Sequence, residues 1–186
     1  MKKTLSLLTL IVLLFTNCRK IKEETLLNFD VAFEETVAVP PPGVQSEGGL
    51  PAGGASLDFP SYAIATNIKQ KLDQYNTKSE KVTDVKLLLH SIQILRPQYH
   101  YFDYLDSVEL YISAPNQPEK LIAYRYDVPK GIFTLDFKTV QDVNLKQYLL
   151  QDTIYLRMRA HVNAVPPGDE VLRVRSTFQV RANPLL

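Results

Sequence analysis

Apolar and polar residues alternate with a period of two along most of the chain after residue 26. The alternation is clearest over Asp106–Ala114, where Val108, Leu110 and Ile112 share one face and polar residues take the other. A period of two is that of a β-strand with one buried face. The same pattern predicts further strands over residues 27–39, 82–95, 120–126, 132–137, 153–162 and 171–180, with a short strand or edge at 57–59.

The alternation is interrupted inside two of these strands. It slips at Glu34-Glu35 before it resumes, which predicts a bulge in the first strand. It also changes phase near Ser91 in the strand over 82–95, where Leu89 still belongs to the first apolar series. We therefore expect a regular strand with one bulge at the start of the domain and a long, bent strand near its middle.

Two segments have a helical period instead. Ile64, Ile68, Leu72 and Tyr75 recur at spacings of three and four residues, which predicts an amphipathic helix over residues 61–75. The apolar residues of 142–150 are spaced for one or two helical turns. The chain thus combines many strands with one or two short helices.

Glycine and proline mark the connections. Residues 40–56 hold five of the seven glycines and four of the twelve prolines, so we expect one long loop that is either functional or simply mobile. Shorter turns are expected at 115–118 and 129–131. Pro166-Pro167-Gly168-Asp169 would join the last two strands as a hairpin with a long connection.

Seven or eight short strands without βα alternation predict an antiparallel, immunoglobulin-like β-sandwich over residues 27–183, with a barrel as the alternative. The chain has no Trp and a single Cys, so it lacks the buried Trp and the inter-sheet disulfide that stabilise the core of antibody domains. A domain of this length can bury enough Val, Ile, Leu, Phe and Tyr to be stable without them.

The first 17 residues have the layout of a secretory signal. Lys2 and Lys3 precede an apolar run from Leu5 to Phe15, and a short polar end follows. A helix needs about 20 apolar residues to cross a bilayer, so a cleaved signal peptide explains this run better than a membrane anchor does.

The only cysteine, Cys18, follows this signal directly. Leu14-Phe15-Thr16-Asn17-Cys18 resembles the lipobox of bacterial lipoproteins, whose cysteine thiol becomes a diacylglyceryl thioether while the signal is removed. Asn17 departs from the Gly, Ala or Ser that the lipobox prefers at that position. The alternative is an incidental cysteine behind an ordinary signal. The resemblance implies lipid attachment at Cys18, a tether over residues 18–26, and a membrane partner reached through the lipid.

Charge and composition exclude several function classes. The full chain has a formal charge of +1, and removal of residues 1–17 takes away two lysines and no acid, which leaves −1. Neither value gives the basic surface that nucleic acid requires. One cysteine provides no intramolecular disulfide and no cluster of zinc thiolates. No motif predicts a cofactor.

No known catalytic motif is present. We interpret His90, His100 and His161 as structural residues rather than metal ligands. Asp103 with Asp106, and next Asp169 with Glu170, are the best-spaced carboxylates for a calcium site or a carboxylate-based hydrolase. Because turn formation explains these acids more simply, we expect a protein that is not an enzyme.

The densest aromatic segment is Gln98–Tyr104. Tyr99, Tyr101, Phe102 and Tyr104 could together form a platform that stacks on sugars or grips a protein. The alternative is that these rings fill the end of the sandwich at a corner between two strands. Burial of the segment would distinguish the two hypotheses.

Two arginine pairs have the same spacing in neighbouring predicted strands. Arg157 and Arg159 alternate in one strand, and Arg173 and Arg175 alternate in the next. If the two strands pair as a hairpin, the four arginines form a basic stripe on the outward face, where like charges repel unless carboxylates or an anionic partner lie beside them. We prefer a solvated face with acidic neighbours, and lipid headgroups or an acidic glycan are the alternative partners.

Several short stretches of the mature chain are similar to those of small lipoproteins of the Bacteroidetes envelope. They are Thr66-Asn67 before a helix, Asn76-Thr77-Lys78, Val82–Ile94, Phe102–Ser107 before Glu109–Ile112, and Ile122-Ala123. This resemblance implies an envelope location, with the outer membrane preferred, and a sandwich fold, but no catalytic residue. We therefore expect a lipid-anchored envelope protein with a binding or structural role. A hydrolase, or a subunit of a larger envelope assembly completed at an unpaired edge strand, are the alternatives.

Overall fold

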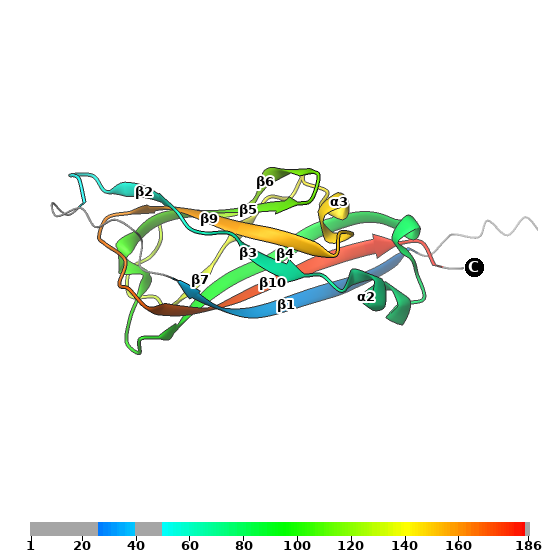
Figure 1. Cartoon of the computed structure of the whole chain (residues 1–186), viewed down its shortest axis with the longest axis horizontal. Coiled ribbons are helices and arrows are strands. Elements are labelled where there is room, and N and C mark those ends of the chain that lie inside the picture. Colours follow the sequence, from blue (N-terminus) through cyan, green and yellow to red (C-terminus); the bar gives the residue numbers. More distant parts are fainter. Residues whose placement is uncertain (1–25, 40–49, 185–186) are drawn as a thin grey trace, which may run out of the picture.

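The structure is a computed structural model that describes residues 26–39 and 50–184. These residues form two antiparallel sheets packed face to face (Figure 1). None of the described strands pairs with a strand of the other sheet, so the predicted β-sandwich is confirmed and the barrel is not formed. The predicted signal peptide, Cys18, the tether before Leu26, and residues 40–49 of the predicted loop lie outside the described residues.

The first sheet has four strands in the order β1-β10-β4-β7. Its strands are β1 (Leu27–Val39), β10 (Glu170–Ala182), β4 (Val82–Arg96) and β7 (Thr134–Asp136). The second sheet has six strands, with β2-β9-β5-β6-β8 in order and β3 also paired with β9. Its strands are β2 (Ala55–Asp58), β3 (Tyr62–Ala65), β5 (Leu105–Ala114), β6 (Gln117–Tyr126), β8 (Lys138–Thr139) and β9 (Thr153–Val162).

Alternate side chains of both sheets meet in one hydrophobic core. Leu110 and Ile112 of β5, Leu156 of β9 and Phe178 of β10 are fully buried there. Each belongs to the apolar series that the period of two predicts, so the sequence pattern fixes which face of each strand turns inward.

Strand β1 is an edge strand without the bulge predicted at Glu34-Glu35. It pairs with β10 in one unbroken register from Leu27↔Ala182 to Val39↔Glu170. Glu35 simply takes an inward-facing position opposite Val174 while its side chain stays exposed. The alternation is interrupted because a charged residue occupies an inward-facing position of an edge strand. Such charges discourage the addition of another strand to the sheet.

Strand β4 contains the predicted phase change, but at Leu88 rather than near Ser91. Its register against β10 shifts between Leu87 and Leu89, so Leu88 is an additional residue. As a result Leu88 and Leu89 are both exposed, whereas Val85 and Leu87 before the bulge are buried. Leu89 thus has the hydrophobicity of the core face but lies outside it.

The first predicted helix is only half helical. Residues Tyr62–Ala65 form β3, and the α-helix α2 covers Ile68–Gln74. Ile64 is buried in β3 through pairing with β9, and Ile68 and Leu72 are buried in α2. Ile64 reaches the core from a strand, and Ile68 and Leu72 reach it from a helix. The spacing of the apolar residues alone did not show where the strand ends and the helix begins.

The remaining helices are short. The predicted turns over 142–150 are confirmed as α3 (Lys146–Leu149), and two 3-10 turns are η1 (Ser79–Lys81) and η2 (Phe102–Tyr104). In the described part of the chain, no helix has the length and apolar character needed to span a membrane.

The last two strands do not form the predicted hairpin. Strand β9 lies in the six-stranded sheet, whereas β10 lies between β1 and β4 in the four-stranded sheet. The connection through Pro166–Asp169 therefore crosses from one layer of the sandwich to the other. Alternation shows that both segments are strands, but it carries no information about which strand each one pairs with.

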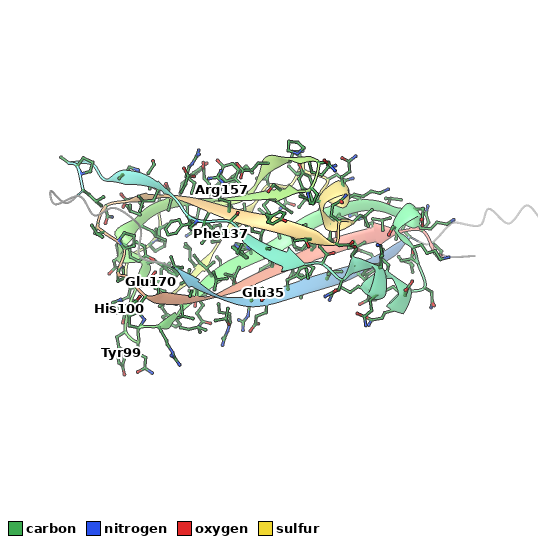
Figure 2. The ribbon with its side chains drawn as sticks, viewed as in Figure 1. Glu35, Tyr99, His100, Phe137, Arg157 and Glu170 are labelled. Atoms are coloured by element: carbon green, nitrogen blue, oxygen red, sulfur yellow. The ribbon has the colours of Figure 1, made fainter. Side chains whose placement is uncertain are left out.

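The sandwich has two distinct ends (Figure 1). The N-terminal end is where Leu27, Val82 and Ala182 meet by strand pairing. The loop end is where Val39 pairs with Glu170 and Arg96 pairs with Val171. Figure 2 shows Tyr99, His100 and Glu170 at the loop end.

Candidate functional site

The aromatic segment predicted from sequence lies at the loop end, between β4 and β5. Its two halves have opposite environments. Tyr99 is 88% exposed and Tyr101 is 42% exposed, whereas Phe102 is 0% and Tyr104 is 8% exposed. The structure therefore places Tyr99 and Tyr101 on the surface, while Phe102 and Tyr104 fill the end of the sandwich, as the alternative hypothesis expected.

The exposed half borders a surface pocket of about 400 Å³. Phe133, which is 52% exposed, joins the two tyrosines in its wall. Strand pairing explains this position, because Gln93 of β4 pairs with Thr134 of β7, directly after Phe133. The pocket is lined by Gln93, Ile94, Leu95, Pro97, Gln98, Tyr99, His100, Tyr101 and Phe133.

The chemistry of this pocket is aromatic and amide-rich. Among the described residues, no Asp, Glu, Lys or Arg lines this pocket. The Gln93 side-chain oxygen accepts a hydrogen bond from Arg173 Nη1 at 3.3 Å, which orients the amide. Such a wall offers flat apolar faces next to neutral hydrogen-bonding groups, and it lacks the charge that an ionic ligand would need.

Tyr99 is held in an unusual backbone conformation. Its φ is +63°, in the left-handed region that bulky L-residues rarely adopt. That conformation costs roughly 1–2 kcal/mol for a residue with a Cβ. A strained and almost fully exposed aromatic residue contributes little to folding, and such strain is often found at binding sites.

The buried half of the segment is attached to the core by specific contacts. Phe102 N donates to Ile132 O at 2.9 Å, and Tyr104 Oη donates to Glu170 Oε2 at 2.6 Å. Glu170 is only 1% exposed, and this burial raises the pKa of its carboxyl group, although the Tyr104 hydrogen bond and the nearby His100 act in the opposite direction. Burial, together with Glu170, raises the pKa of the Tyr104 hydroxyl.

The two aspartates of the hydrolase hypothesis have separate contacts. Asp103 Oδ1 accepts from Gly131 N at 2.6 Å, and Asp106 Oδ1 accepts from Asn163 and, at 3.4 Å, from Lys130 Nζ. Both carboxylates thus tie neighbouring loops to the end of the sandwich, as turn-forming residues do.

The second acidic pair is also divided by its environment. Asp169 is exposed, whereas Glu170 is buried at the start of β10. Asp169 lies in the turn before the strand, with a φ of +67°, so the two carboxylates have separate environments and do not share one site.

Each histidine has a different environment. His90 is fully buried, with Nδ1 2.9 Å from Ser176 Oγ and its ring edge-on to Phe137, and burial lowers its pKa to about 3. His161 Nε2 is 2.9 Å from Gly53 O, and His100 lines the aromatic pocket. Among the described residues, no group of three or more His, Cys, Asp or Glu side chains is placed to hold a metal ion.

The predicted stripe of four arginines does not form. Because β9 and β10 belong to different sheets, Arg157 and Arg159 lie on one outer face of the sandwich and Arg173 and Arg175 on the other. On the four-stranded sheet, Glu34 bridges the pair, 3.3 Å from Arg173 Nε and 2.7 Å from Arg175 Nε. The continuous stripe is thus absent, and Glu34 is the acidic neighbour of this arginine pair.

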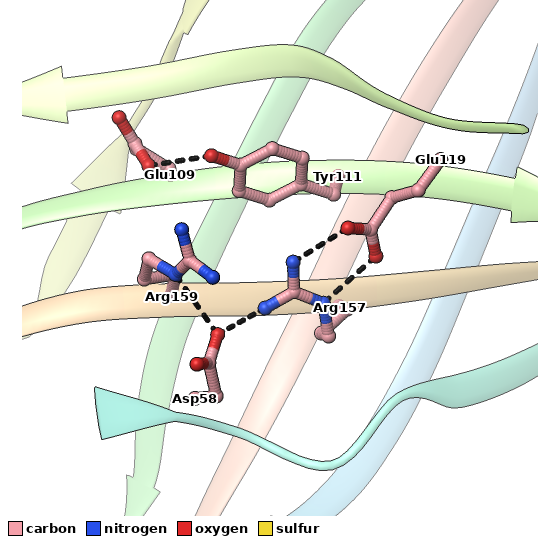
Figure 3. A network of polar contacts seen from close by, with 6 residues as sticks. All are labelled: Asp58, Glu109, Tyr111, Glu119, Arg157 and Arg159. Carbon is pink, nitrogen blue, oxygen red and sulfur yellow. Dashed lines mark hydrogen bonds and ion pairs between the residues drawn. The ribbon is translucent and has the colours of Figure 1, made fainter. Parts of the chain in front are cut away.

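On the six-stranded sheet the arginines are part of a closed network (Figure 3). Arg157 forms a bidentate pair with Glu119 at 2.7 and 2.6 Å, and Asp58 bonds both Arg157 and Arg159. Hydrogen bonds from these arginines lower the pKa of both acids. The Arg157 guanidinium also stacks over the Tyr111 ring at 4.8 Å. The network joins edge strand β2 to strands β9 and β6, which is a structural role.

Sequence reasoning found two of the pocket's aromatic residues and missed the third. Phe133 follows the predicted turn at 129–131, but nothing local indicates that it meets Tyr101. The buried state of Glu170 was also missed, because its neighbours Gly168 and Asp169 suggested a solvated turn.

Comparison with known proteins identifies no family for this chain. No family model and no curated protein matches the sequence. Solved structures do match, among them a chain titled Desmodium yellow mottle tymovirus, which is 10% identical, with 87% of this chain and 90% of that chain covered. The TM-score of that superposition is 0.27, too low to support an argument about fold or function.

Proposed function

We propose that this protein is a lipid-anchored protein of the bacterial cell envelope that binds a neutral glycan in the aromatic pocket at its loop end. The role is binding and not catalysis. The observation that carries the glycan part is Tyr99, an 88% exposed, conformationally strained aromatic residue at the edge of a pocket of about 400 Å³.

The anchor part rests on the sequence before β1. Cys18 stands at the end of a signal-like segment, and residues 19–26 would serve as the tether to the sandwich. Lipid burial contributes about 0.8 kcal/mol for each CH₂ group, so two or three acyl chains would keep the protein on a membrane. The preferred location is the outer membrane, in keeping with the resemblance to Bacteroidetes lipoproteins.

The arrangement of the two ends suits this function. The 13 residues of β1 run from the N-terminal end to the loop end, a distance of about 40 Å at the usual rise of a strand. An anchor attached before Leu27 would therefore hold the pocket beside Tyr99 on the far side of the domain from the membrane. A ligand there would be approached from solvent.

The pocket wall matches the chemistry of a neutral sugar. Sugar rings have apolar C–H faces that can pack on Tyr99, Tyr101 and Phe133, and hydroxyl groups that can bond the amides of Gln93 and Gln98. In the part of the chain that the structure describes, the pocket wall has no Lys, Arg, Asp or Glu that would form an ion pair with a charged glycan. A protein partner would need a larger apolar area than this pocket offers.

Labelling with a palmitate analogue tests the anchor. Cells that express the full chain should yield labelled protein in the membrane fraction, and Cys18→Ser should yield none, because no other thiol is present. A Lys20→Ser variant serves as the matched control and should remain labelled. Retained label in Cys18→Ser would refute the anchor.

Calorimetry tests the glycan. We expect the full chain, purified in a mild detergent, to bind at least one hexasaccharide from a panel of neutral glucose, mannose and N-acetylglucosamine oligomers. Tyr99→Ala should weaken that binding about threefold to tenfold, since an aromatic stacking contact is worth roughly 0.5–1.5 kcal/mol beyond its buried area. Tyr155→Ala, which alters an exposed tyrosine on β9, should leave it unchanged. Equal losses in both variants, or no binding to any of these sugars, would contradict the proposal.

The alternative of an assembly subunit completed at an edge strand has weaker support. The long edge strand here is β1, and Glu35 places a charge at one of its inward-facing positions. Helix α2 packs against inward-facing side chains of that strand, with Tyr75 stacked on Phe29 at 3.9 Å and Lys71 over Phe33 at 5.5 Å. The inward-facing charge of Glu35 disfavours addition of a strand from another chain.

A further inference from the structure

Two neighbouring cavities lie between edge strands on one side of the sandwich, and we call them the outer and inner parts of one candidate cavity. Its outer part, about 180 Å³, lies between the end of β1 and the β2–β3 segment. Its inner part, about 20 Å³, lies between the two sheets. Val39, Phe59 and Met158 line both parts, so the two are adjacent. The aromatic pocket beside Tyr99 shares no lining residue with either part.

The described residues that line the inner part are apolar, except Glu170 and Tyr104. One carboxylate oxygen, Glu170 Oε2, accepts the Tyr104 hydrogen bond, but Glu170 Oε1 has no hydrogen-bond partner among the described residues. The Glu170 side chain is buried, so this oxygen has no access to bulk water either. A buried acceptor without a donor is costly and rare in native structures.

The outer part also contains one unpartnered polar group. Tyr62 lines it, and its hydroxyl is buried without a partner in the described chain. Among the described residues, no Lys or Arg lines either part of the cavity. His100, which acts to lower the pKa of Glu170, lines the aromatic pocket instead, so the described wall of this cavity supplies no positive charge to Glu170 Oε1.

The sizes of the two parts limit what can enter. The inner part has room for one group the size of a water molecule, and an ammonium group is of that size. The outer part is slightly larger than an engineered cavity of about 150 Å³ that takes up benzene. A phenyl ring or a short alkyl chain would fit there, between Val39, Phe59 and Met158.

We propose that this cavity is a binding site for a small primary amine with an aryl or short alkyl body. The ammonium group donates to Glu170 Oε1, and the apolar body occupies the outer part between the two edge strands. Burial raises the pKa of Glu170, although the Tyr104 hydrogen bond and His100 act in the opposite direction, in agreement with a carboxylate whose second oxygen has no partner. The inference does not depend on the proposed glycan site or on the lipid anchor.

Three probes with the same ring test the inference by calorimetry on the full chain in mild detergent. They are 2-phenylethylamine, 2-phenylethanol and 3-phenylpropionate. The amine should bind with a Kd on the order of 1 mM or lower, as expected for a ligand of nine heavy atoms. The alcohol and the carboxylate should each bind at least about tenfold more weakly, because a charge-assisted hydrogen bond to Glu170 is lost.

Two charge variants separate the site from general surface attraction. Glu170→Gln should weaken amine binding at least about tenfold while it retains an acceptor for Tyr104. Asp30→Asn removes an exposed charge of β1 that lines neither part of the cavity, and it should leave the affinity unchanged. Figure 2 labels Glu170 at the loop end. Equal losses in the two variants would mean that the amine is attracted by surface charge alone.

Ser61→Trp provides a check that does not alter Glu170. Ser61 is exposed at the cavity mouth, so a large side chain there should block entry without disturbing the core. Amine binding should be abolished while urea denaturation remains unchanged. If the three probes bind alike, or if both Glu170→Gln and Ser61→Trp bind the amine normally, the inner part holds a water molecule only and the proposal is wrong.

Discussion

The two halves of the aromatic segment Tyr99–Tyr104 differ sharply in solvent exposure, although they are adjacent in sequence. Tyr99 and Tyr101 are exposed at the loop end, whereas Phe102 and Tyr104, next to them in sequence, are buried. The buried pair lies in the 3-10 turn η2, which hydrogen bonds to the core through Ile132 and Glu170. The buried half thus fixes the position of the exposed half, and stability and binding can be altered separately within the six residues Tyr99–Tyr104.

The largest effect should come from the centre of the buried half. Phe102→Ala should lower the free energy of unfolding by roughly 3–5 kcal/mol, because it leaves a cavity the size of a phenyl ring at a fully buried site. Tyr101→Ala should change it by no more than about 0.5 kcal/mol, as is usual for surface positions. Urea denaturation measures both. Similar losses in the two variants would show that the segment is not divided in this way.

The next effect concerns the Tyr104–Glu170 hydrogen bond and its pH dependence. Tyr104→Phe leaves Glu170 Oε2 without its donor and should cost roughly 1–3 kcal/mol. The folded-state pKa of Glu170 is raised above its unfolded value. Its contribution to stability is therefore fully present below the unfolded pKa and is lost as the pH rises through the folded pKa. The Tyr104 hydrogen bond favours the ionised form of Glu170, so its removal should raise the folded-state pKa further and make stability depend more strongly on pH.

The cost of Tyr104→Phe should accordingly be greater at pH 7.5 than at pH 4.5, measured each time against the unmodified protein by urea denaturation. His90 has the opposite effect: its pKa is lowered in the folded state, so the protein loses stability as the pH falls below the pKa of His90 in the unfolded chain. Comparison of the variant and the unmodified protein at the same pH cancels this contribution. Glu170→Gln should remove the difference between the two pH values. A cost that does not vary with pH would contradict a buried, ionisable partner for Tyr104.

The smallest effect should have opposite signs at the two exposed tyrosines. Tyr99→Gly should raise the free energy of unfolding by at most about 1 kcal/mol, since glycine adopts a positive φ without strain. Tyr101 has an ordinary extended conformation, with φ −128°, so Tyr101→Gly should lower stability by about 0.5–1 kcal/mol through backbone entropy. Both are read from thermal and urea denaturation. A loss of stability in Tyr99→Gly would mean that its ring contributes to the core.

The sequence predicted the part of the candidate site that depends on local composition, but not the part that depends on strand pairing. Tyr99 and Tyr101 belong to a segment of unusual composition, which is visible in the sequence alone. Phe133 reaches them through the pairing of β4 with β7 and the hydrogen bond from Ile94 N to Phe133 O at 2.9 Å. That pairing joins segments about forty positions apart, and no local pattern encodes it.

The arginine pairs and Ile64 show the same limit in the fold. Arg157 and Arg173 have similar local sequences, yet they lie on opposite faces of the sandwich because β9 and β10 belong to different sheets. Ile64 has the spacing of a helical residue, but pairing of β3 with β9 draws it into a strand. In both cases tertiary contacts decided between two structures that local spacing allowed equally.

The sequence by itself determined that the chain is a strand-rich sandwich and which face of most strands is buried, because a period of two is a local property of the backbone. It also placed the only cysteine directly behind a signal-like segment. Only the tertiary structure decided which sheet each strand joins, which half of the aromatic segment is exposed, and that Glu170 is buried with one oxygen unpartnered. These features depend on contacts between residues far apart in the chain, and the free energy of such contacts is set by packing and desolvation rather than by the order of neighbouring residues.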